Sequence, residues 1–341
     1  MNKNITSRDV AKAAGVSQSL VSLILNNVPD KKIKPETREH VLEAARQLNY
    51  NINVNARNMK NRRAGAIGLL SSWDTNSFVF PPVIKGIQSV CAENDLGVVI
   101  CTGKSGSLGI KDYVNYYLQN RIDGLIYVSY VGVQYDGIID ELNKNCVPFV
   151  CIIGARDLSG VSCVDVSFTE SGYMAVKHLG ESGYRSIAYI QGGNLKELNY
   201  AEQERIASCR KAAEEKDLKF SIVDLFGKLS EEGSRVRAAE EFLVKSICDC
   251  VVATSYDCFI TLKAAARAGI NVPGALGVIS LDNELYAPYV FPSLSTIDEP
   301  LAEIARHATH ILLDKINGDN ICTKLEINPL LSVRESSNRK I

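Results

Sequence analysis

Residues 6–26, TSRDVAKAAGVSQSLVSLILN, contain two short amphipathic helical segments separated by a glycine, and this spacing strongly constrains the N-terminal fold. Thr6 is placed to cap the first helix, and Val10 and Ala14 fall on one apolar face of it. Gly15 supplies the left-handed residue that ends this helix. The pattern predicts a helix-turn-helix, whose second helix presents its N-terminal end to the major groove of DNA.

The second helix is expected to carry the residues that read DNA. Ser17 is placed to cap it, and Val21 and Ile24 recur at the spacing of a buried helix face. The N-terminal and outward positions hold side chains that can hydrogen-bond base edges. These predicted base-reading residues are Gln18, Ser19 and Ser22.

The charge distribution agrees with a DNA-binding N-terminal part. Residues 1–64 contain twelve Lys and Arg against five Asp and Glu, a net charge of +7. Because the whole chain carries −1, the remainder carries −8. A basic module attached to an acidic body indicates contact with phosphate, although a solvated charged face on an ordinary small domain would give the same count.

Length and composition predict a multi-domain protein with well-filled cores. The 341 residues suffice for two or three domains, and 46% of them are apolar. The chain has neither a cationic start with an apolar run nor an apolar stretch of membrane-spanning length, so we expect a cytoplasmic protein. Its ten cysteines lie between Cys91 and Cys322, mostly in apolar runs and without ligand-like spacing. We therefore expect buried reduced thiols, no disulfide and no metal site.

From Ala64 onward, apolar strand candidates alternate with amphipathic helical segments. The candidate strands lie within residues 66–72, 96–103, 123–130, 147–153, 186–193, 220–227, 249–255 and 276–283. Near-continuous apolar strands separated by helices predict a parallel sheet covered on both faces. There are too many for one typical doubly wound sheet, so we expect two similar α/β lobes with a ligand cleft at the carboxyl ends of their strands.

Several longer motifs make the chain similar to the lac-repressor-like (LacI/GalR) family of bacterial transcription regulators over essentially its whole length. The resemblance rests mainly on DVAKAAGVS, VSLILN and KPETREHVLEAARQLNY, with support from NARNMK, AIGLL, ESGYRSIAYIQGG, RAGINVP and LSTIDEPLAEIARHA. It implies a small all-α helix-turn-helix headpiece, a hinge helix, and a core of two doubly wound parallel-sheet lobes like the periplasmic sugar-binding proteins. The implied parts are a headpiece at 1–50, a hinge and linker at 51–63, an N-terminal lobe at 64–164 plus 294–323, and a C-terminal lobe at 165–293 plus 324–341. The chain would then cross between the lobes near residues 164, 294 and 323.

The resemblance implies DNA contacts from the second headpiece helix and from the hinge. Gln18 and Ser19 match positions that the family uses for base readout, whereas Leu23 stands where a base-contacting arginine is common. Leu23 can touch a thymine methyl group or simply be an exposed apolar residue, and both interpretations stay open. The implied DNA-binding residues are Thr6, Ser17, Gln18, Ser19, Ser22, Leu23, Asn26, Asn53, Arg57, Met59 and Lys60.

The hinge helix, roughly residues 53–60, is too short to be stable alone, so it is expected to fold only against a partner's hinge on DNA. Met59 stands where similar proteins insert a leucine into the minor groove, and it either acts as that wedge or packs on its dimer mate. Seven residues follow Arg334, too few for a heptad-bearing tail, which favours a homodimer on a pseudo-palindromic operator. Lys34 replaces the family's usual serine cap, so a weak start is expected for the third helix at Pro35.

The resemblance also implies a small-molecule effector between the lobes and no cofactor. The candidate effector-binding residues are Trp73, Phe78, Arg205, Ser255 and Asp282. A base and an acid facing one cleft suit a hydroxyl-rich or zwitterionic ligand, such as a carbohydrate or a related metabolite. Either Thr254–Ser255 or, with a gap placed differently, Ser255–Tyr256 replaces the family's frequent Asn–Asp, which argues against a standard hexose. Ordinary alternatives are a surface ion pair for Arg205, a cap on the next segment of the chain for Asp282 and core packing for Phe78.

The implied mechanism couples the effector to DNA through the lobes. The ligand changes the position of one lobe relative to the other, hence the spacing of the two hinge segments in a dimer, with a coupling of roughly 1–3 kcal/mol. The most probable class is therefore a repressor acting on DNA inside a bacterium, associated with the nucleoid when bound. Whether the effector releases the protein from DNA or loads it stays open at this point.

Three other classes compete with this interpretation. A periplasmic-type solute receptor shares the two-lobed core but would lack the basic headpiece. An enzyme is not expected, because no GxGxxG, P-loop or nucleophile elbow is present and GKSGSLG at 103–109 lacks P-loop spacing. The remaining alternative is a ligand-independent, architectural DNA-binding protein with a vestigial cleft, whose operator affinity no small molecule would change.

Overall fold

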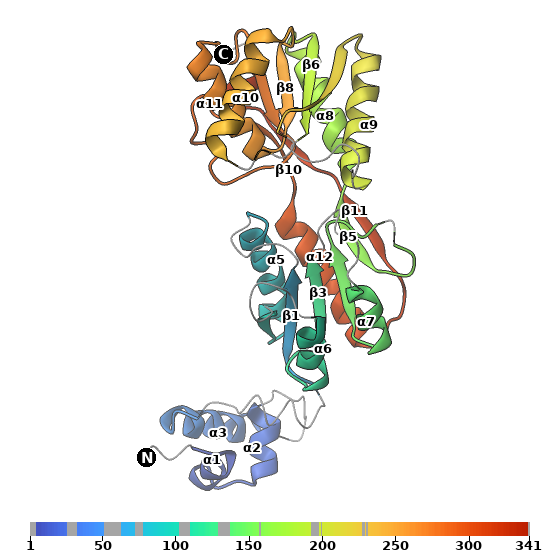
Figure 1. Cartoon of the computed structure of the whole chain (residues 1–341). Helices are drawn as coiled ribbons and strands as arrows, with labels where there is room; N and C mark the ends of the chain where they lie inside the picture. Colours follow the sequence, from blue (N-terminus) through green and yellow to red (C-terminus); the bar gives the residue numbers. More distant parts are fainter. Residues whose placement is uncertain are drawn as a thin grey trace. The chain divides into compact units, whose positions relative to one another are not determined.

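The computed structural model of the chain divides into two compact units, Met1–Gly65 and Ala66–Ile341 (Figure 1). We call the first unit the headpiece and the second the two-lobed core. The described residues are 5–25, 33–50, 63–71, 78–101, 110–128, 137–156, 158–191, 198, 200–226, 229 and 231–339. Each unit is treated by itself below.

The described residues of the headpiece form three short helices packed around one apolar cluster. The helices are α1 (Ser7–Ala13), α2 (Gln18–Leu25) and α3 (Pro35–Gln47). Apolar residues at helical spacing on all three meet in the centre, so the inward faces predicted for the first two helices are confirmed. The buried members are Val10, Ala11, Ala14, Val21, Ile24, Val41, Ala44 and Ala45. Burying these side chains supplies most of the stability of helices that are too short to persist alone.

Local signals fix where the first two helices begin and end. The Asp9 carboxylate accepts hydrogen bonds from the Thr6 N–H at 2.9 Å and from the Thr6 hydroxyl at 2.7 Å. Gly15 has φ +63°, the left-handed conformation that the sequence predicted there. The Leu20 N–H donates to Ser17 Oγ at 3.3 Å, so Ser17 caps α2 as expected. The helix-turn-helix geometry therefore follows directly from residues in this short stretch.

The start of α3 is weak in the way that the sequence predicted. Lys34 is its N-cap residue and makes no side-chain capping hydrogen bond. We expect Lys34→Ser to raise the free energy of unfolding of the headpiece by about 1 kcal/mol, because a serine hydroxyl satisfies a free helical N–H and a cation leaves the positive end of the helix. Hydrogen exchange of the α3 amides in the full chain measures this. Lys12→Ser, within α1, removes the same charge without adding a cap and should not stabilise; equal stabilisation by both variants would contradict the capping argument.

The first lobe of the core, the N-lobe, is a six-stranded parallel sheet with strand order β11-β5-β4-β3-β1-β2. Its strands are β1 (Ala66–Ser71), β2 (Gly97–Cys101), β3 (Gly124–Val128), β4 (Phe149–Ile152), β5 (Cys163–Val166) and β11 (Lys324–Ile327). Its helices are α5 (Phe80–Glu93), α6 (Ile110–Leu118), α7 (Ile138–Lys144) and α12 (Leu301–Ile316). Helices α5 and α12 cover one face of the sheet, and the apolar cluster on the other face includes residues of α6 and α7.

The second lobe, the C-lobe, has strand order β12-β10-β9-β8-β6-β7, and only the β10–β12 pair among its described strands is antiparallel. Its strands are β6 (Ser186–Gln191), β7 (Lys219–Asp224), β8 (Cys250–Ala253), β9 (Gly277–Ser280), β10 (Ser295–Asp298) and β12 (Leu330–Ser332). Its helices are α8 (Phe168–Glu181), α9 (Tyr200–Glu215), α10 (Glu232–Lys245), α11 (Ser255–Ala268) and the 3-10 turn η3 (Glu335–Ser337). The predicted fold class, two doubly wound parallel-sheet lobes beside a helical headpiece, is confirmed.

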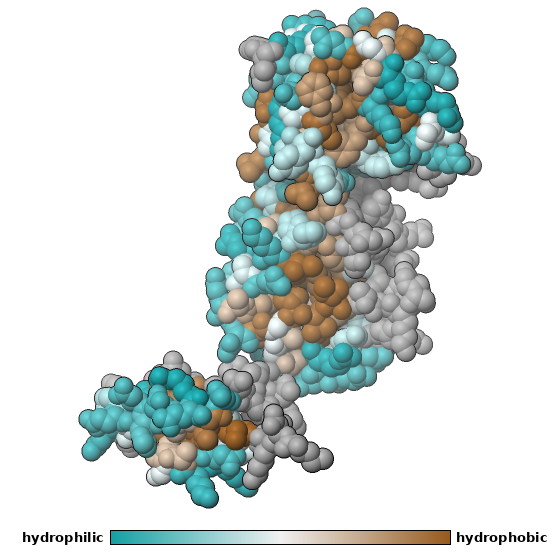
Figure 2. Space-filling model, turned by 90° about the vertical axis from the view of Figure 1, so that its left-hand side faces the viewer, coloured by the Kyte–Doolittle hydropathy of each residue, from teal (hydrophilic) through white to brown (hydrophobic). Residues whose placement is uncertain are grey.

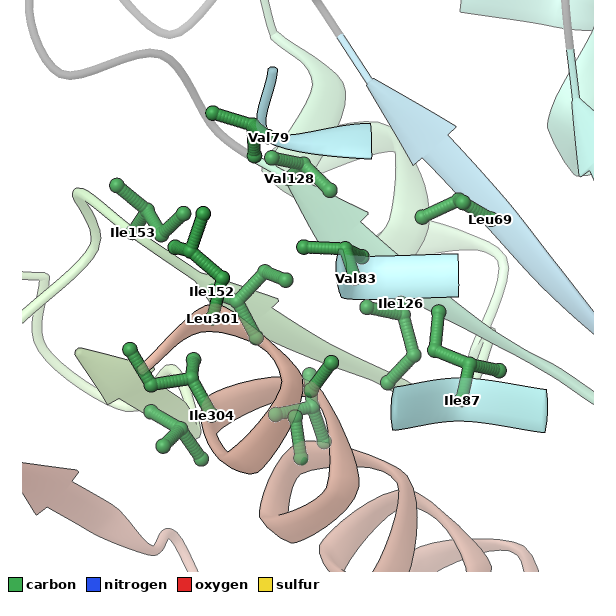
Figure 3. Packing of buried hydrophobic residues seen from close by; sticks show 14 of the residues in the cluster. Leu69, Val79, Val83, Ile87, Ile126, Val128, Ile152, Ile153, Leu301 and Ile304 are labelled. Carbon is green, nitrogen blue, oxygen red and sulfur yellow. The ribbon is translucent and has the colours of Figure 1, made fainter. Parts of the chain in front are cut away.

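Apolar side chains from strands and helices pack together on each sheet face, and Figure 3 shows this for the face of the N-lobe sheet that α5 and α12 cover. There Val83 and Ile87 of α5 and Ile304 of α12 lie against Ile126 of β3 and Ile152 of β4. In the C-lobe, α8 and α9 cover one face and α10 and α11 the other. This double cover explains why the central strands read as continuous apolar runs in the sequence.

Two glycines allow one helix pair in each lobe to pack closely. A Cβ added at Gly86 of α5 would fall against the carbonyl oxygen of Ala302 in α12. A Cβ at Gly172 of α8 would likewise fall against the Arg205 carbonyl oxygen and the Ser208 hydroxyl of α9. Both contacts involve backbone, so neither helix pair can keep its spacing with a larger residue at that glycine.

The chain crosses between the lobes three times, and each crossing follows a strand. It leaves the N-lobe after β5, returns to it after β10, and leaves it again after β11. The sequence placed these crossings near 164, 294 and 323, which assigns β10 to the N-lobe and β11 to the C-lobe. That assignment is wrong, because each strand completes the sheet of the lobe that the chain is about to leave. The observed lobes are residues 66–166 with 301–327, and 168–298 with 330–339.

The C-terminal segment packs into the C-lobe. Ser336 Oγ donates to the Val278 carbonyl at 2.6 Å and accepts the Ser295 N–H at 2.8 Å, while Ser337 Oγ bonds Ser295 Oγ at 2.7 Å. Both serines of η3 are fully buried. Ser336 and Ser337 therefore lie in the interior of the C-lobe, where they hydrogen-bond to β9 and β10.

Candidate nucleic-acid interface and effector site

The N-terminal end of α2 presents a polar, exposed surface. The side chains of Ser17, Gln18, Ser19, Ser22 and Leu23 are all exposed, while Val21 and Ile24 on the opposite side are buried. The helix therefore has one face for the headpiece interior and one for a ligand, which is the arrangement that a major-groove reading helix needs.

Contacts between α1 and α2 hold Gln18 in place. Its side-chain amide nitrogen donates to Ser7 Oγ at 2.8 Å, and its oxygen accepts from Arg8 Nε at 3.3 Å. Ser17 Oγ and Ser19 Oγ lie 3.0 Å apart and share a hydrogen bond. The polar groups are thus oriented before DNA arrives, which lowers the entropic cost of base contacts.

Leu23 is 36% exposed and lies off the buried face, as predicted. Its position is compatible with contact to a thymine methyl group and equally with simple exposure. The remaining predicted DNA-binding residues, Asn26, Asn53, Arg57, Met59 and Lys60, lie outside the described residues, together with the predicted hinge. Trp73, predicted for the effector site, lies outside them as well. Their roles stay predictions.

At the carboxyl edge of the C-lobe sheet, Asp282 follows β9 and hydrogen-bonds both the end of that strand and the start of α11. Its Oδ1 accepts the N–H of Ser255 at 2.6 Å and the hydroxyl of Ser280 at 2.7 Å. Ser255, fully buried, also bonds Ser280 Oγ at 2.9 Å. Asp282 therefore binds the first N–H group of α11, a helix that precedes it in the chain. The alternative of a cap on the segment that follows Asp282 stays a prediction.

Arg205 of α9 is buried between two carboxylates. Its Nη1 lies 2.9 Å from Glu202 Oε1 and its Nη2 lies 2.7 Å from Glu299 Oε1. The guanidinium also stacks over the Phe168 ring, 4.7 Å from its centre. The predicted family arginine is thus close to the strand ends, but protein carboxylates already neutralise it, and its ion pairs are buried rather than on the surface.

A second arginine site was missed by the sequence reasoning. Arg235 of α10 lies 2.5 Å from Asp257 Oδ1, and its guanidinium sits over the rings of Phe226 at 4.4 Å and Tyr256 at 4.9 Å. Phe226 follows β7, and Tyr256 and Asp257 follow β8. Their place just after two parallel strands was the available signal, because the carboxyl ends of such strands meet at one sheet edge.

Phe78, at the other end of the predicted site, is partly buried and packs against the apolar cluster of the N-lobe. This contact supports the core-packing alternative for Phe78. The structure therefore brings Arg205, Ser255 and Asp282 to the C-lobe edge, while Phe78 contributes to the N-lobe interior.

Burial shifts the pKa values of two carboxyl groups in this region, Asp257 and Glu299. It raises the pKa of Asp257 to about 6 and that of Glu299 to about 7, although Arg235 and Arg205 respectively act in the opposite direction. A raised carboxyl pKa means that the folded state holds the proton more tightly than the unfolded state. The associated stability is therefore fully present below the unfolded pKa and is lost as the pH rises through about 7 for Glu299.

Glu299→Gln tests this linkage. Between about pH 5.5 and pH 8 we expect the stability gap between wild type and variant to change by roughly 1–3 kcal/mol, because only wild type must ionise a buried carboxyl group. Denaturant unfolding at several pH values measures the difference. Glu303→Gln, an exposed carboxyl group in α12, is the matched control. Parallel pH profiles for Glu299→Gln and wild type would contradict the linkage.

Seven cysteines are buried, as expected, whereas Cys146 and Cys322 are exposed and Cys248 is half-buried. The described residues contain no group of three or more His, Cys, Asp or Glu side chains placed to hold a metal ion. None of the helices in the described ranges is both long and apolar enough to cross a membrane.

The helix-turn-helix with an exposed polar reading helix, attached to a two-lobed core, defines a DNA-binding regulator with a periplasmic-binding-protein-like core. Family models agree: residues 6–53 match bacterial regulatory proteins of the lacI family, and residues 176–337 match a periplasmic binding protein-like domain. The chain is 30% identical over 318 residues to the HTH-type transcriptional repressor PurR of Vibrio cholerae, covering 91% of each chain. The chain belongs to the lacI family of bacterial regulatory proteins, and the predicted resemblance is confirmed.

Solved structures show the same fold. The transcriptional regulator CelR in complex with cellobiose is 26% identical, with a TM-score of 0.67, covering 97% of this chain and 99% of that one. The lac repressor dimer bound to operator and the anti-inducer ONPF is 20% identical, with a TM-score of 0.76, covering 98% of this chain and 99% of that one. The second likeness concerns the fold alone.

Proposed function

We propose that the protein is a transcriptional repressor that binds a pseudo-palindromic operator as a homodimer and whose operator affinity is set by a small molecule held between the two lobes. The observation that carries this proposal is the reading face of α2, where polar side chains are exposed and pre-oriented by contacts with α1. In this proposal the protein regulates transcription in the bacterial cytoplasm by binding DNA and is not an enzyme.

Base readout is assigned to the N-terminal end of α2. Gln18 offers an amide for adenine, Ser19 and Ser22 offer hydroxyl groups, and Leu23 offers an apolar contact to thymine. Thr6 and Ser17 lie at the helix starts, where backbone N–H groups and the helix dipole favour phosphate. The hinge residues Asn53, Arg57, Met59 and Lys60, with Asn26, extend this surface in the proposal.

The effector is assigned to the carboxyl edge of the C-lobe sheet. Asp282, Ser255 and Arg205 gather there, and Arg235 with Asp257 adds a second charged pair. Carboxylates accept hydrogen bonds and guanidinium groups donate them, so this edge suits a polar ligand with several hydroxyl or amino groups. A carbohydrate or related metabolite fits, and the cellobiose in the CelR complex supports that class. Trp73 remains a candidate on the N-lobe side.

A homodimer needs an apolar surface, and the connection between β9 and β10 offers one. Tyr289 is 81% exposed and Phe291 is 91% exposed, with Leu285 and Tyr286 beside them in the chain. Four such side chains present on the order of 600 Å², most of the roughly 800 Å² per partner of a standard interface. The upper part of Figure 2 shows one face of the C-lobe, on which hydrophobic residues lie among hydrophilic ones. We propose that the β9–β10 connection forms the homodimer interface by binding a second copy of this chain.

The first experiment is selection of bound sites from random duplex DNA by the full chain, repeated at two salt concentrations. An enriched pseudo-palindrome supports a sequence-specific regulator, whose genomic neighbours then point to an effector pathway. If nothing is enriched and affinity only collapses as salt rises, binding is non-specific and the proposal fails.

Effector control is tested on the selected operator with a panel of sugars, nucleobases and their derivatives. The proposal expects at least one compound to raise the melting temperature of the core and to shift operator affinity by roughly 5- to 150-fold. A panel that changes neither quantity, across all compound classes, favours the ligand-independent DNA-binding alternative.

A further inference from the structure

Helix α9 belongs to the C-lobe, but its first turn packs against the N-lobe. Helix α9 packs along α8 in the C-lobe. Ala201, 1% exposed, nevertheless belongs to the apolar cluster that joins N-lobe residues with Phe168 at the start of α8, and Tyr200 packs on that cluster. The Tyr200 ring meets the edge of Phe168 with centres 5.8 Å apart. The first turn of α9 therefore lies at the boundary between the two lobes.

A buried hydrogen bond holds this turn to the N-lobe. The Tyr200 hydroxyl donates to Asp165 Oδ2 at the end of β5. Asp165 is fully buried and also accepts the N–H groups of Gly154 and Val166, each at 3.0 Å. Burial raises the pKa of Asp165 to about 6, and burial beside that carboxyl group also raises the pKa of Tyr200, which keeps the phenol protonated as a donor. The contact joins a C-lobe side chain to an acceptor that lies inside the N-lobe.

An arginine forms a second bridge beside the first. Arg156, which follows β4, pairs with Glu204 of α9 in the C-lobe and with Glu326 of β11 in the N-lobe. Its guanidinium lies 5.6 Å from the centre of the Tyr200 ring. The Lys324 ammonium donates to the Arg156 carbonyl at 2.6 Å, so the loop that carries this arginine is itself fixed to the N-lobe.

We propose that the first turn of α9 is a latch, formed by Tyr200–Asp165 and Arg156–Glu204, that holds the two lobes in the arrangement seen here and must release before they can separate. The three chain crossings allow the lobes to move but do not fix their spacing. The latch residues therefore set how often the core opens. The consequence for DNA binding rests on the proposed function, whereas the latch itself does not.

The two bridges contribute unequally. Releasing Tyr200 leaves a carboxylate that is fully buried with one hydrogen bond fewer, which is costly because burial removes the carboxylate from bulk solvent. The ion pair of Arg156 with Glu204 is more than a quarter exposed on both sides, 28% and 29%, so solvent screens it and its loss matters less. The tyrosine hydroxyl is thus the main element of the latch.

Tyr200→Phe tests the latch because it removes one hydroxyl group and leaves the ring on Phe168. In the full chain without DNA or effector, we expect hydrogen exchange to speed up by roughly tenfold in two segments together. These segments are residues 152–168, which comprise the end of the N-lobe and the crossing after β5, and residues 200–206 of α9. Small-angle scattering of the same sample should give a larger radius of gyration.

The matched control is Tyr173→Phe. The Tyr173 hydroxyl also donates to a carboxylate, Glu215, at 2.8 Å, but both residues lie in the C-lobe. It should leave exchange in residues 152–168 unchanged. Equal profiles for the two variants, or a change confined to α9 in Tyr200→Phe, would overturn the proposal.

A second variant keeps the test independent of folding failure. Glu204→Gln weakens the outer bridge at a partly exposed position, and we expect a smaller increase in exchange, about two- to threefold, in the same two segments. No change in either segment would contradict the role of the Arg156 bridge. Because these measurements use neither DNA nor ligand, their failure leaves the proposed repressor function standing, and failure of operator selection leaves the latch standing.

Discussion

Arg205→Ala is expected to lower the free energy of unfolding of the two-lobed core by about 3–5 kcal/mol. The substitution leaves Glu202 and Glu299 buried without their cation, with exposed side-chain fractions of only 12% and 8%. It also removes the guanidinium that covers the Phe168 ring. Denaturant unfolding of the full chain, followed by the circular dichroism of the core, measures the loss.

The pH dependence of this loss separates charge from packing. Arg205 lowers the pKa of Glu299, so without this arginine the Glu299 carboxyl group should take up a proton more readily, and the deficit should be smaller at pH 5 than at pH 8. Arg210→Ala, an exposed arginine on the same helix, is the matched control and should cost about 0.5 kcal/mol or less. A deficit that is equally large for Arg210→Ala, or independent of pH, would contradict the buried-charge explanation.

The described helices of the headpiece could be predicted almost residue by residue, because their determinants are local. The cap at Ser17, the left-handed Gly15 and the buried Val21 all depend on neighbours within a few positions in the chain. Even the defect at Lys34, a helix start without a side-chain cap, is visible in the sequence. Helix ends and buried faces of this kind follow from periodicity and hydrogen-bonding capacity alone.

The strands at the lobe crossings could not be assigned in the same way. Strands β5, β10 and β11 have only four residues each, and each carries a charged side chain, so none reads as a long apolar run. Which sheet such a strand joins depends on its pairing partner, and β11 pairs with β5 across more than 150 residues of chain. Local sequence contains no information about that choice.

The effector edge shows the same limit at the level of single residues. Resemblance to the family indicated Arg205, but its partner Glu299 lies 94 residues away in the chain. The Arg235–Asp257 pair and the contact of Tyr200 with Asp165 likewise join separate elements. A charge pattern along the sequence cannot show which arginine is already neutralised by the protein and which remains available to a ligand.

The double variant Tyr289→Asp with Phe291→Asp is expected to convert the dimer to a monomer and to weaken operator binding by roughly 10²- to 10⁴-fold. A monomer engages one half-site at a time, so the gain from linking two headpieces is lost although each headpiece is unchanged. Both side chains are almost fully exposed, so the fold of the single chain should be unaffected. Sedimentation velocity and operator titration measure the two effects.

The control for this prediction is Ile321→Asp with Leu330→Asp, which places the same charges on two exposed apolar residues elsewhere in the core, 68% and 63% exposed. It should leave both assembly and operator affinity unchanged. A dimer that persists in Tyr289→Asp with Phe291→Asp would exclude the β9–β10 connection as the interface. If Tyr289→Asp with Phe291→Asp remained dimeric but lost operator affinity, the lost affinity could not be attributed to loss of the dimer. The two copies would then have to be joined through another surface of the chain.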